Sequence, residues 1–151
     1  MIMPTKTLKL LLLCTGNTCR SQMAHAMCQQ WVQSHGLSVA IESRGIRANT
    51  GDATTAEVLT VLVEANINWQ GSSKKLSVED LDWADDVWGM TQEHLTCAKR
   101  LAQDLHHYRQ PRFQLLAVDR ELSDPLNCGI AAYQELFLTL QELIPKRLSA
   151  I

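Results

Sequence analysis

A short apolar run that leads through a turn into a helical pattern constrains the fold of this chain more than any other feature. The run Leu8–Leu13 is almost continuously apolar, which is typical of a strand buried on both faces of a parallel sheet. Ser21 then opens a segment with a helical apolar stripe, and Gly36 is placed to cap its carboxyl end. This order predicts a fold in which strands and helices alternate.

The same alternation continues along the chain. The predicted strands are Leu8–Leu13, Ser38–Ser43, Asp86–Met90 and Phe113–Val118, and the predicted helices begin at Ser21, Thr54, Ser77, Thr91 and Ile130. Because helices that join parallel strands cover both faces of the sheet, we expect an α/β fold. It is a single-domain, three-layer sandwich over residues 1–151 with a central four-stranded parallel sheet. Fraying of the last helix is expected at Pro145.

Composition limits the setting and the partners. The five cysteines are an odd number, which excludes a fully paired disulfide framework and favours a reducing cytoplasm. A net charge of −2 provides no general field for nucleic acid or a membrane surface, so neither is expected as a partner. Residues 1–75 nevertheless hold seven lysines and arginines against four acidic residues, so an anion site is expected in that half.

One turn carries the residue types that anion chemistry needs. The segment Cys14-Thr15-Gly16-Asn17-Thr18-Cys19-Arg20-Ser21 joins the first predicted strand to the first helix. Gly16 and Asn17 tolerate unusual backbone angles, so successive N–H groups can form a nest for an anion beside the helix N-terminus. Arg20 adds a planar fork that matches two phosphate oxygens. Because such surroundings lower a cysteine pKa, Cys14 is predicted to be a nucleophile toward phosphorus.

A carboxylic acid is expected at the same edge of the sheet. Leu13-Cys14 and Val118-Asp119 both end predicted strands, and ligands of such sheets bind beyond the carboxyl ends of the strands. The loop after the last strand contains Asp124-Pro125, and Asp119 is a rival candidate for the acid.

The Cys-x-Gly-Asn-x-Cys-Arg-Ser loop resembles the active-site loop of the low-molecular-weight protein-tyrosine-phosphatase family. Ser43-Arg44-Gly45 resembles the family's Ser-Ala-Gly, and Asp124-Pro125 falls where the family has its Asp-Pro acid loop. The resemblance covers about residues 7–145. It implies hydrolysis of phosphate from phosphorylated protein side chains, phosphotyrosine being the family default. It also implies phosphorylated proteins as partners and a monomer or weak dimer.

The resemblance assigns a role to each matched residue. Cys14 attacks phosphorus to form a phosphocysteine, and Arg20 binds the equatorial oxygens. Asp124 protonates the leaving group and then deprotonates the attacking water. No metal or other cofactor is implied, since the loop supplies the charge stabilisation. The other residues implied to bind phosphate or shape the loop are Thr15, Gly16, Asn17, Thr18, Cys19 and Ser21, with Ser43 in support. Ser21 and Ser43 are the implied partners of the Asn17 side chain.

The substrate is left open by three differences from the tyrosine-directed pattern. Those members usually have Ile at the position of Thr18, and they place aromatic residues at Leu126-Asn127 and within Arg47–Thr50. The loop instead resembles that of the bacterial protein-arginine-phosphatase branch, and a threonine oxygen can accept a hydrogen bond from a guanidinium. Arg44 and Arg47 argue the other way, because they put positive charge near a cationic substrate.

Other functions are weaker alternatives. Arsenate reductases of this fold need two more cysteines after about residue 73, but Ser73–Met90 contains none and Cys97 stands alone. A phosphoryl carrier or a non-catalytic phosphoprotein-binding module could use the same loop. Cys19 is either a filler of the loop or a reversible disulfide partner of Cys14. Zinc is disfavoured, because the cysteine and histidine spacing fits no standard site and Arg20 opposes a cation.

Overall fold

The structure is a computed structural model that describes residues 6–103, 105 and 110–151. Its strands are β1 (Leu8–Cys14), β2 (Val39–Gly45), β3 (Asp86–Gly89) and β4 (Arg112–Leu115). Its helices are α1 (Arg20–His35), α2 (Ala56–Glu64), α3 (Val78–Trp83), α4 (Gln92–Ala102) and α5 (Ile130–Ser149). The predicted alternation of strands and helices is confirmed.

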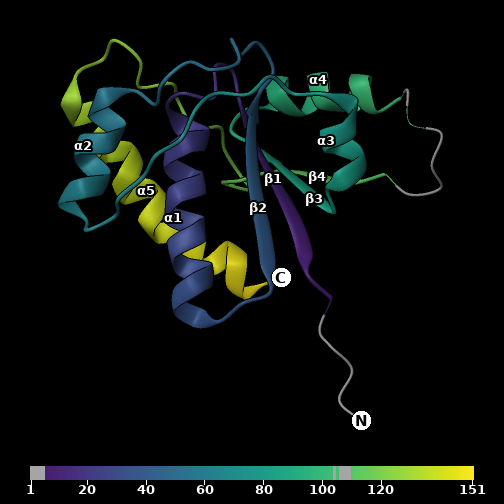
Figure 1. Ribbon diagram of the computed structural model, residues 1–151, viewed down its shortest axis with the longest axis horizontal. Coiled ribbons are helices and arrows are strands. Elements are labelled where there is room, and N and C mark those ends of the chain that lie inside the picture. The colour runs from purple at the N-terminus through teal and green to yellow at the C-terminus, as the bar shows by residue number, and fades with distance from the viewer. Residues whose placement is uncertain (1–5, 104, 106–109) are drawn as a thin grey trace.

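The four strands form one parallel sheet with the order β2-β1-β3-β4. Helices α1, α2 and α5 lie on one face of this sheet, and α3 and α4 lie on the other (Figure 1). The predicted three-layer α/β sandwich is therefore confirmed. Strand β1 is central, so whatever follows its carboxyl end lies at the middle of one sheet edge.

Strand β1 is apolar throughout because it contributes to both cores. Leu10 and Leu12 pack against the layer of α1 and α5, whereas Leu11 and Leu13 pack against the layer of α3 and α4. All four side chains are fully buried. Full burial of a leucine contributes roughly 1.5–3 kcal/mol, so β1 anchors the loop that follows it.

Two of the boundaries that differ from the sequence prediction have a clear physical reason. Strand β4 ends at Leu115 rather than at residue 118, because Val118 adopts a left-handed conformation with φ of 63° in a tight turn. Asp119 therefore lies in that turn and not at a strand end. Helix α5 continues through Pro145 to Ser149 without fraying. Burial of Ile144 and Leu148 on either side of the proline offsets its missing hydrogen bond.

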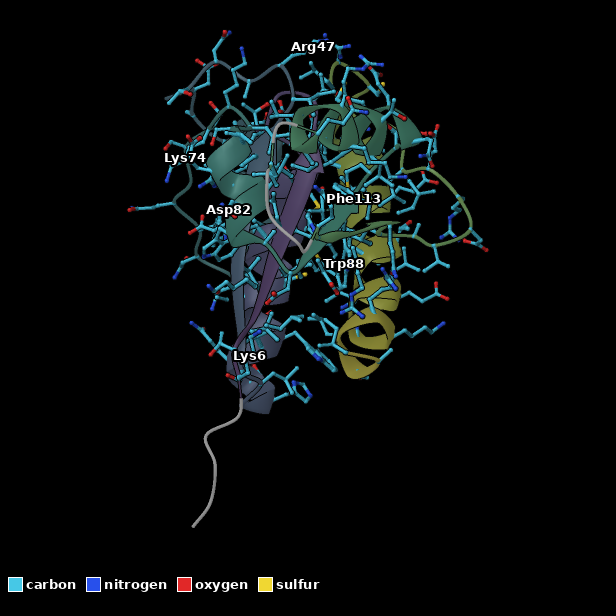
Figure 2. All side chains as sticks on the ribbon, turned by 90° about the vertical axis from the view of Figure 1, so that its right-hand side faces the viewer. Lys6, Arg47, Lys74, Asp82, Trp88 and Phe113 are labelled. Atoms are coloured by element: carbon cyan, nitrogen blue, oxygen red, sulfur yellow. The ribbon has the colours of Figure 1, made fainter. Side chains whose placement is uncertain are left out.

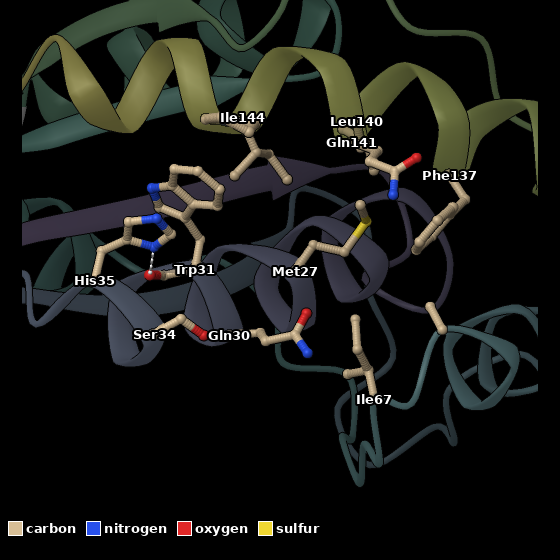
Figure 3. A pocket seen from close by; sticks show the side chains of 12 residues that line it. Met27, Gln30, Trp31, Ser34, His35, Ile67, Phe137, Leu140, Gln141 and Ile144 are labelled. Carbon is tan, nitrogen blue, oxygen red and sulfur yellow. Dashed lines mark hydrogen bonds between the residues drawn. The ribbon is translucent and has the colours of Figure 1, made fainter.

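A cavity of about 320 Å³ lies between α1 and α5 (Figure 3). Trp31 stacks on His35 at its rim with a ring separation of 3.7 Å, and Met27, Phe137 and Ile144 contribute apolar surface. None of its lining residues belongs to the 14–21 loop, so it is separate from the predicted anion site. Within the described ranges, no helix has the length and apolar character that crossing a membrane requires.

Candidate active site

The loop between β1 and α1 rests directly on the backbone of β2. A Cβ atom on Gly45 would lie 2.6 Å from the carbonyl oxygen of Thr15 and 2.9 Å from the backbone nitrogen of Asn17. Any side chain there would push the loop outward, which explains why the Ser-Arg-Gly segment ends in glycine. Cys14 is the last residue of β1 and Arg20 the first of α1, so both ends of the loop are fixed by regular structure.

A chain of hydrogen bonds within the loop ends on the Cys14 sulfur. Asn17 adopts a left-handed conformation with φ of 55°, and its Oδ1 accepts the backbone N–H of Lys74 at 2.9 Å. Its Nδ2 therefore faces Ser21 Oγ, to which it donates at 2.7 Å. Because Ser21 Oγ accepts that bond, its own proton is free to be donated to Cys14 Sγ, 2.8 Å away. The backbone N–H of Asn17 also donates to Sγ, at 3.2 Å.

These contacts act on the pKa of Cys14 in opposite directions. Burial is the largest influence, and it raises the pKa of the thiol above its usual value. The hydrogen bonds from Ser21 and Asn17 and the charge of Arg20 lower it. The sequence prediction counted the donors and the cation but not the burial, since a linear pattern does not show that Cys14 is only 2% exposed.

Ser21→Ala is expected to slow alkylation of Cys14 by iodoacetate at neutral pH by about tenfold, because the thiolate loses one charge-assisted hydrogen bond. The substitution removes an interaction that lowers the pKa, so the pH profile of alkylation moves to higher pH. Ser34→Ala, on an exposed position of α1, serves as the matched control. A profile of Ser21→Ala that overlays the wild-type profile would contradict this account.

Arg20 is a buried cation whose ion pair with Asp124 is long. It is 4% exposed, and its two terminal nitrogens donate to the Leu122 carbonyl at 2.9 Å and to Thr15 Oγ1 at 3.3 Å. The Asp124 carboxylate lies 3.7 Å away, beyond hydrogen-bond distance, and its side chain is 45% exposed. Because this ion pair is long and its carboxylate is exposed, the guanidinium is still able to bind an incoming oxyanion.

Asp124, rather than Asp119, faces the loop. Its Oδ1 accepts the backbone N–H of Leu126 at 3.0 Å, which leaves Oδ2 on the side of Arg20. Asp119 is 76% exposed and pairs with Arg120 at 3.6 Å. The structure therefore places Asp124, and not Asp119, beside Arg20.

Ser43 lies close to the loop but not beside the expected partner. Its Oγ is 2.9 Å from His25 Nδ1, whereas the Asn17 side chain uses Ser21 and the Lys74 backbone. The pairing of Asn17 with Ser43 was therefore wrong. Burial lowers the pKa of His25 to about 4, so this histidine is neutral near pH 7. The sequence carried no signal for this contact, because the two residues are distant in the chain.

The remaining loop residues lie together as expected. The backbone oxygen of Thr18 accepts the N–H of Thr55 at 3.0 Å, and the Thr18 hydroxyl lies 3.7 Å from Cys19 Sγ. Cys19 is 5% exposed, with its Sγ 3.0 Å from Thr55 Oγ1 and 3.7 Å from the Tyr133 hydroxyl. A Cβ on Gly16 would meet only the Thr18 hydroxyl, at 3.7 Å.

The two arginines that argued against a cationic substrate are both paired with carboxylates. Arg44 Nε lies 3.1 Å from Asp80, on the face of the sheet that α3 covers. Arg47 forms an ion pair with Glu93 at the start of α4. Figure 2 shows Arg47 at the opposite end of the molecule from Lys6. Each positive charge is therefore offset by a neighbouring carboxylate.

One further residue was missed by the sequence analysis. His94, in the first turn of α4, is 1% exposed, and its Nε2 lies 3.0 Å from Thr15 Oγ1. The available signal was the spacing Thr91-x-x-His94, which resembles a helix capping box with histidine in the place of Glu or Gln.

Comparison with known proteins shows which family this chain resembles in sequence. The family model described as "Low molecular weight phosphotyrosine protein phosphatase" matches residues 9–151. A protein-arginine-phosphatase of Bacillus subtilis is 30% identical over 139 residues, which are 89% of this chain and 91% of that protein. The low molecular weight protein-tyrosine-phosphatase PtpB of Staphylococcus haemolyticus is also 30% identical, over 92% of this chain and 96% of its own length.

A solved structure shares the fold over most of the chain. It is a mutant of the arginine phosphatase YwlE that carries a phosphorylated active-site serine in place of cysteine. It superposes with a TM-score of 0.81 and 26% identity, and the match covers 91% of both chains. The two relatives and the solved YwlE mutant are all named as phosphatases. The resemblance of the 14–21 loop to a phosphatase loop therefore agrees with the similarity along the whole chain. The chain therefore belongs to the low molecular weight phosphotyrosine protein phosphatase family.

Proposed function

We propose that this protein hydrolyses phosphate from phosphorylated protein side chains, with Cys14 as the nucleophile. One observation carries the proposal: the Cys14 sulfur accepts two hydrogen bonds at the base of a loop where the buried guanidinium of Arg20 has a long ion pair, 3.7 Å, with Asp124. The YwlE mutant supports it, since the residue that carries phosphate there is a serine that replaces an active-site cysteine.

The reaction proceeds in two displacements. Cys14 reacts as the thiolate and Asp124 begins protonated. The Cys14 sulfur attacks phosphorus and forms the S–P bond while the bond to the substrate oxygen or nitrogen breaks, and Asp124 gives its proton to that leaving group. Asp124 then takes a proton from water as the water oxygen attacks phosphorus. The S–P bond breaks, phosphate leaves, and both side chains return to their starting states. Arg20 holds the equatorial oxygens in both steps.

The other loop residues bind the phosphate or determine the conformation of the loop. Backbone N–H groups from Thr15 to Ser21 surround the phosphate, and Ser21 stabilises the sulfur each time it leaves phosphorus. Asn17 sets the curvature of the loop through its left-handed backbone, and Gly16 adds no bulk beside Thr18. Ser43 connects β2 to α1 through His25. No metal or other cofactor takes part in this scheme.

Phosphotyrosine is the substrate that family membership suggests first. The S. haemolyticus relative is named a protein-tyrosine-phosphatase, and its identity to this chain equals that of the arginine phosphatase. Overall sequence similarity therefore does not distinguish phosphotyrosine from phosphoarginine as the substrate. The residues of the site have to be compared instead.

Phosphoarginine is the second candidate, and a specific observation favours it. The positive charges of Arg44 and Arg47 are paired with Asp80 and Glu93, which removes the main objection to a guanidinium substrate. The Thr18 hydroxyl has only a weak contact, to Cys19 Sγ at 3.7 Å, so its oxygen can accept a hydrogen bond from such a substrate.

Phosphate release from matched phosphotyrosyl and phosphoarginyl peptides tests the proposal. Thr18→Ile is expected to lower kcat/KM for the phosphoarginyl peptide by about tenfold to 100-fold, because one hydrogen bond to a charged donor is lost. It is expected to spare or raise kcat/KM for the phosphotyrosyl peptide. Thr18→Val, which removes the hydroxyl at nearly constant volume, controls for the added bulk of isoleucine.

The outcomes separate the candidates. Equal losses on both peptides would exclude Thr18 as the residue that selects phosphoarginine. A wild-type protein that releases phosphate from neither peptide would overturn the proposed function itself and favour the binding-module alternative.

The proposal also covers the domain organisation, the oligomeric state and the cellular compartment. Residues 1–151 act as a single phosphatase domain, as a monomer or weak dimer, in the cytoplasm. All five cysteines are free, which supports a reducing compartment.

A further inference from the structure

His94 and Thr15 connect the start of α4 to the phosphate-binding loop. The backbone N–H of Thr91 donates to His94 Nδ1 at 3.1 Å, so Nδ1 is an acceptor and the ring proton lies on Nε2. Nε2 lies 3.0 Å from Thr15 Oγ1 and therefore donates to that hydroxyl oxygen. The ring is 1% exposed, so water does not compete for either nitrogen.

The Thr15 hydroxyl is a junction between this histidine and Arg20. It accepts from His94 Nε2 and from an Arg20 terminal nitrogen at 3.3 Å, which occupies both of its lone pairs. The other terminal nitrogen of Arg20 donates to the Leu122 carbonyl at 2.9 Å. The guanidinium is thus held at two points, and His94 fixes the oxygen that forms one of them.

We propose that His94 is a positioning residue, which acts through Thr15 to hold the Arg20 guanidinium in the orientation that binds the transferring phosphoryl group. The proposal rests on the proposed function, because it assumes that Arg20 binds that group. A planar fork must match the oxygens in angle as well as distance, so loss of one anchor lowers transition-state binding more than ground-state binding.

The charge state of the histidine supports this role. Burial, helped by the charge of Arg20, lowers the pKa of His94 to about 4. Glu93 and Glu121 raise that pKa and Arg47 lowers it, but burial dominates. The ring is therefore neutral near pH 7, which the acceptor role of Nδ1 requires.

The two ring nitrogens perform different tasks, and two amide substitutions separate them. Nδ1 caps α4 through Thr91, whereas Nε2 holds Thr15. The amide of asparagine falls near the position of Nδ1, so His94→Asn keeps the cap and loses the contact with Thr15. The longer glutamine places its amide near the position of Nε2, so His94→Gln keeps a donor for Thr15.

His94→Asn is expected to lower kcat for a phosphopeptide by about tenfold, with a much smaller change in KM, and to keep a Tm close to that of the wild type. His94→Gln is expected to recover most of the lost kcat. Combining His94→Asn with Thr15→Val is expected to cost no more than Thr15→Val alone, because both changes remove the same connection. His35→Asn, on the exposed end of α1, is the matched control.

Vanadate affinity, measured by calorimetry, gives a readout that does not depend on turnover. Five-coordinate vanadate resembles the transition state, so His94→Asn is expected to weaken its binding more than that of inorganic phosphate. Additive losses in the double variant, equal kcat in the Asn and Gln variants, or unchanged vanadate affinity would each overturn the role of His94. Absent wild-type turnover would instead overturn the proposed function, and the vanadate comparison would still decide the role of His94.

Discussion

Cys14→Ser is expected to lower phosphate release from a phosphopeptide by at least about 10⁴-fold. A serine hydroxyl keeps its proton at neutral pH, and the donors that surround Cys14 in the 14–21 loop do not remove it. A phosphoserine that forms there, as in the YwlE mutant, is expected to persist, because an alkoxide is a poorer leaving group than a thiolate. Binding should survive, because Arg20 and the backbone N–H groups of the loop are unchanged.

Two measurements separate catalysis from binding. Phosphate release is measured under multiple turnover, and affinity for the intact phosphopeptide is measured by calorimetry on the same Cys14→Ser protein. Cys97→Ser, at a half-buried position of α4, is the control and should retain wild-type turnover. Turnover by Cys14→Ser within tenfold of the wild type would exclude Cys14 as the nucleophile. Loss of turnover in Cys97→Ser would show that the effect of a serine substitution is not specific to Cys14.

Arg20→Lys is expected to lower kcat by roughly 10²–10³-fold although the charge is unchanged. A lysine ammonium cannot contact the Leu122 carbonyl, the Thr15 hydroxyl and a phosphate together, as the planar fork can. Its charge still attracts the substrate, so KM should change by less than kcat.

Steady-state kinetics with one phosphopeptide at saturating and limiting concentrations checks this expectation. Arg100→Lys, on the exposed face of α4, is the matched control. If Arg20→Lys raised KM and left kcat intact, Arg20 would serve only to attract the substrate, and its role at the transition state would be lost.

Much of the fold followed from the sequence because its signals are local and repeated. The Leu8–Leu13 run required a strand buried on both faces, and the structure divides its leucines between two cores. The end of β4 was misplaced because Leu116 and Ala117 are buried without being in a strand, and only the left-handed Val118 shows where the chain turns. Apolar sequence indicates burial, but it does not specify hydrogen bonding.

In the candidate site, too, the residues in local motifs were predicted and the contacts between distant residues were not. Cys14, Arg20 and Asp124 are marked by motifs of consecutive residues, and the structure brings all three together. The contacts of His94 with Thr15 and of His25 with Ser43 join residues that are distant in sequence. A single histidine in a helical pattern carries no sign of which partner the fold will supply.

The hydrogen bond from the Lys74 backbone N–H to Asn17 determines which parts of the sequence around position 74 can change without affecting the loop. The series of hydrogen bonds that runs through Asn17 and Ser21 to the Cys14 sulfur begins at the peptide N–H of residue 74. Every residue except proline has such an N–H. Selection on that series of hydrogen bonds therefore acts on the path of the 66–77 connection and not on the side chain at position 74. Insertions and deletions in that connection are constrained by chemistry that takes place at Cys14, while the lysine itself is free to be exchanged.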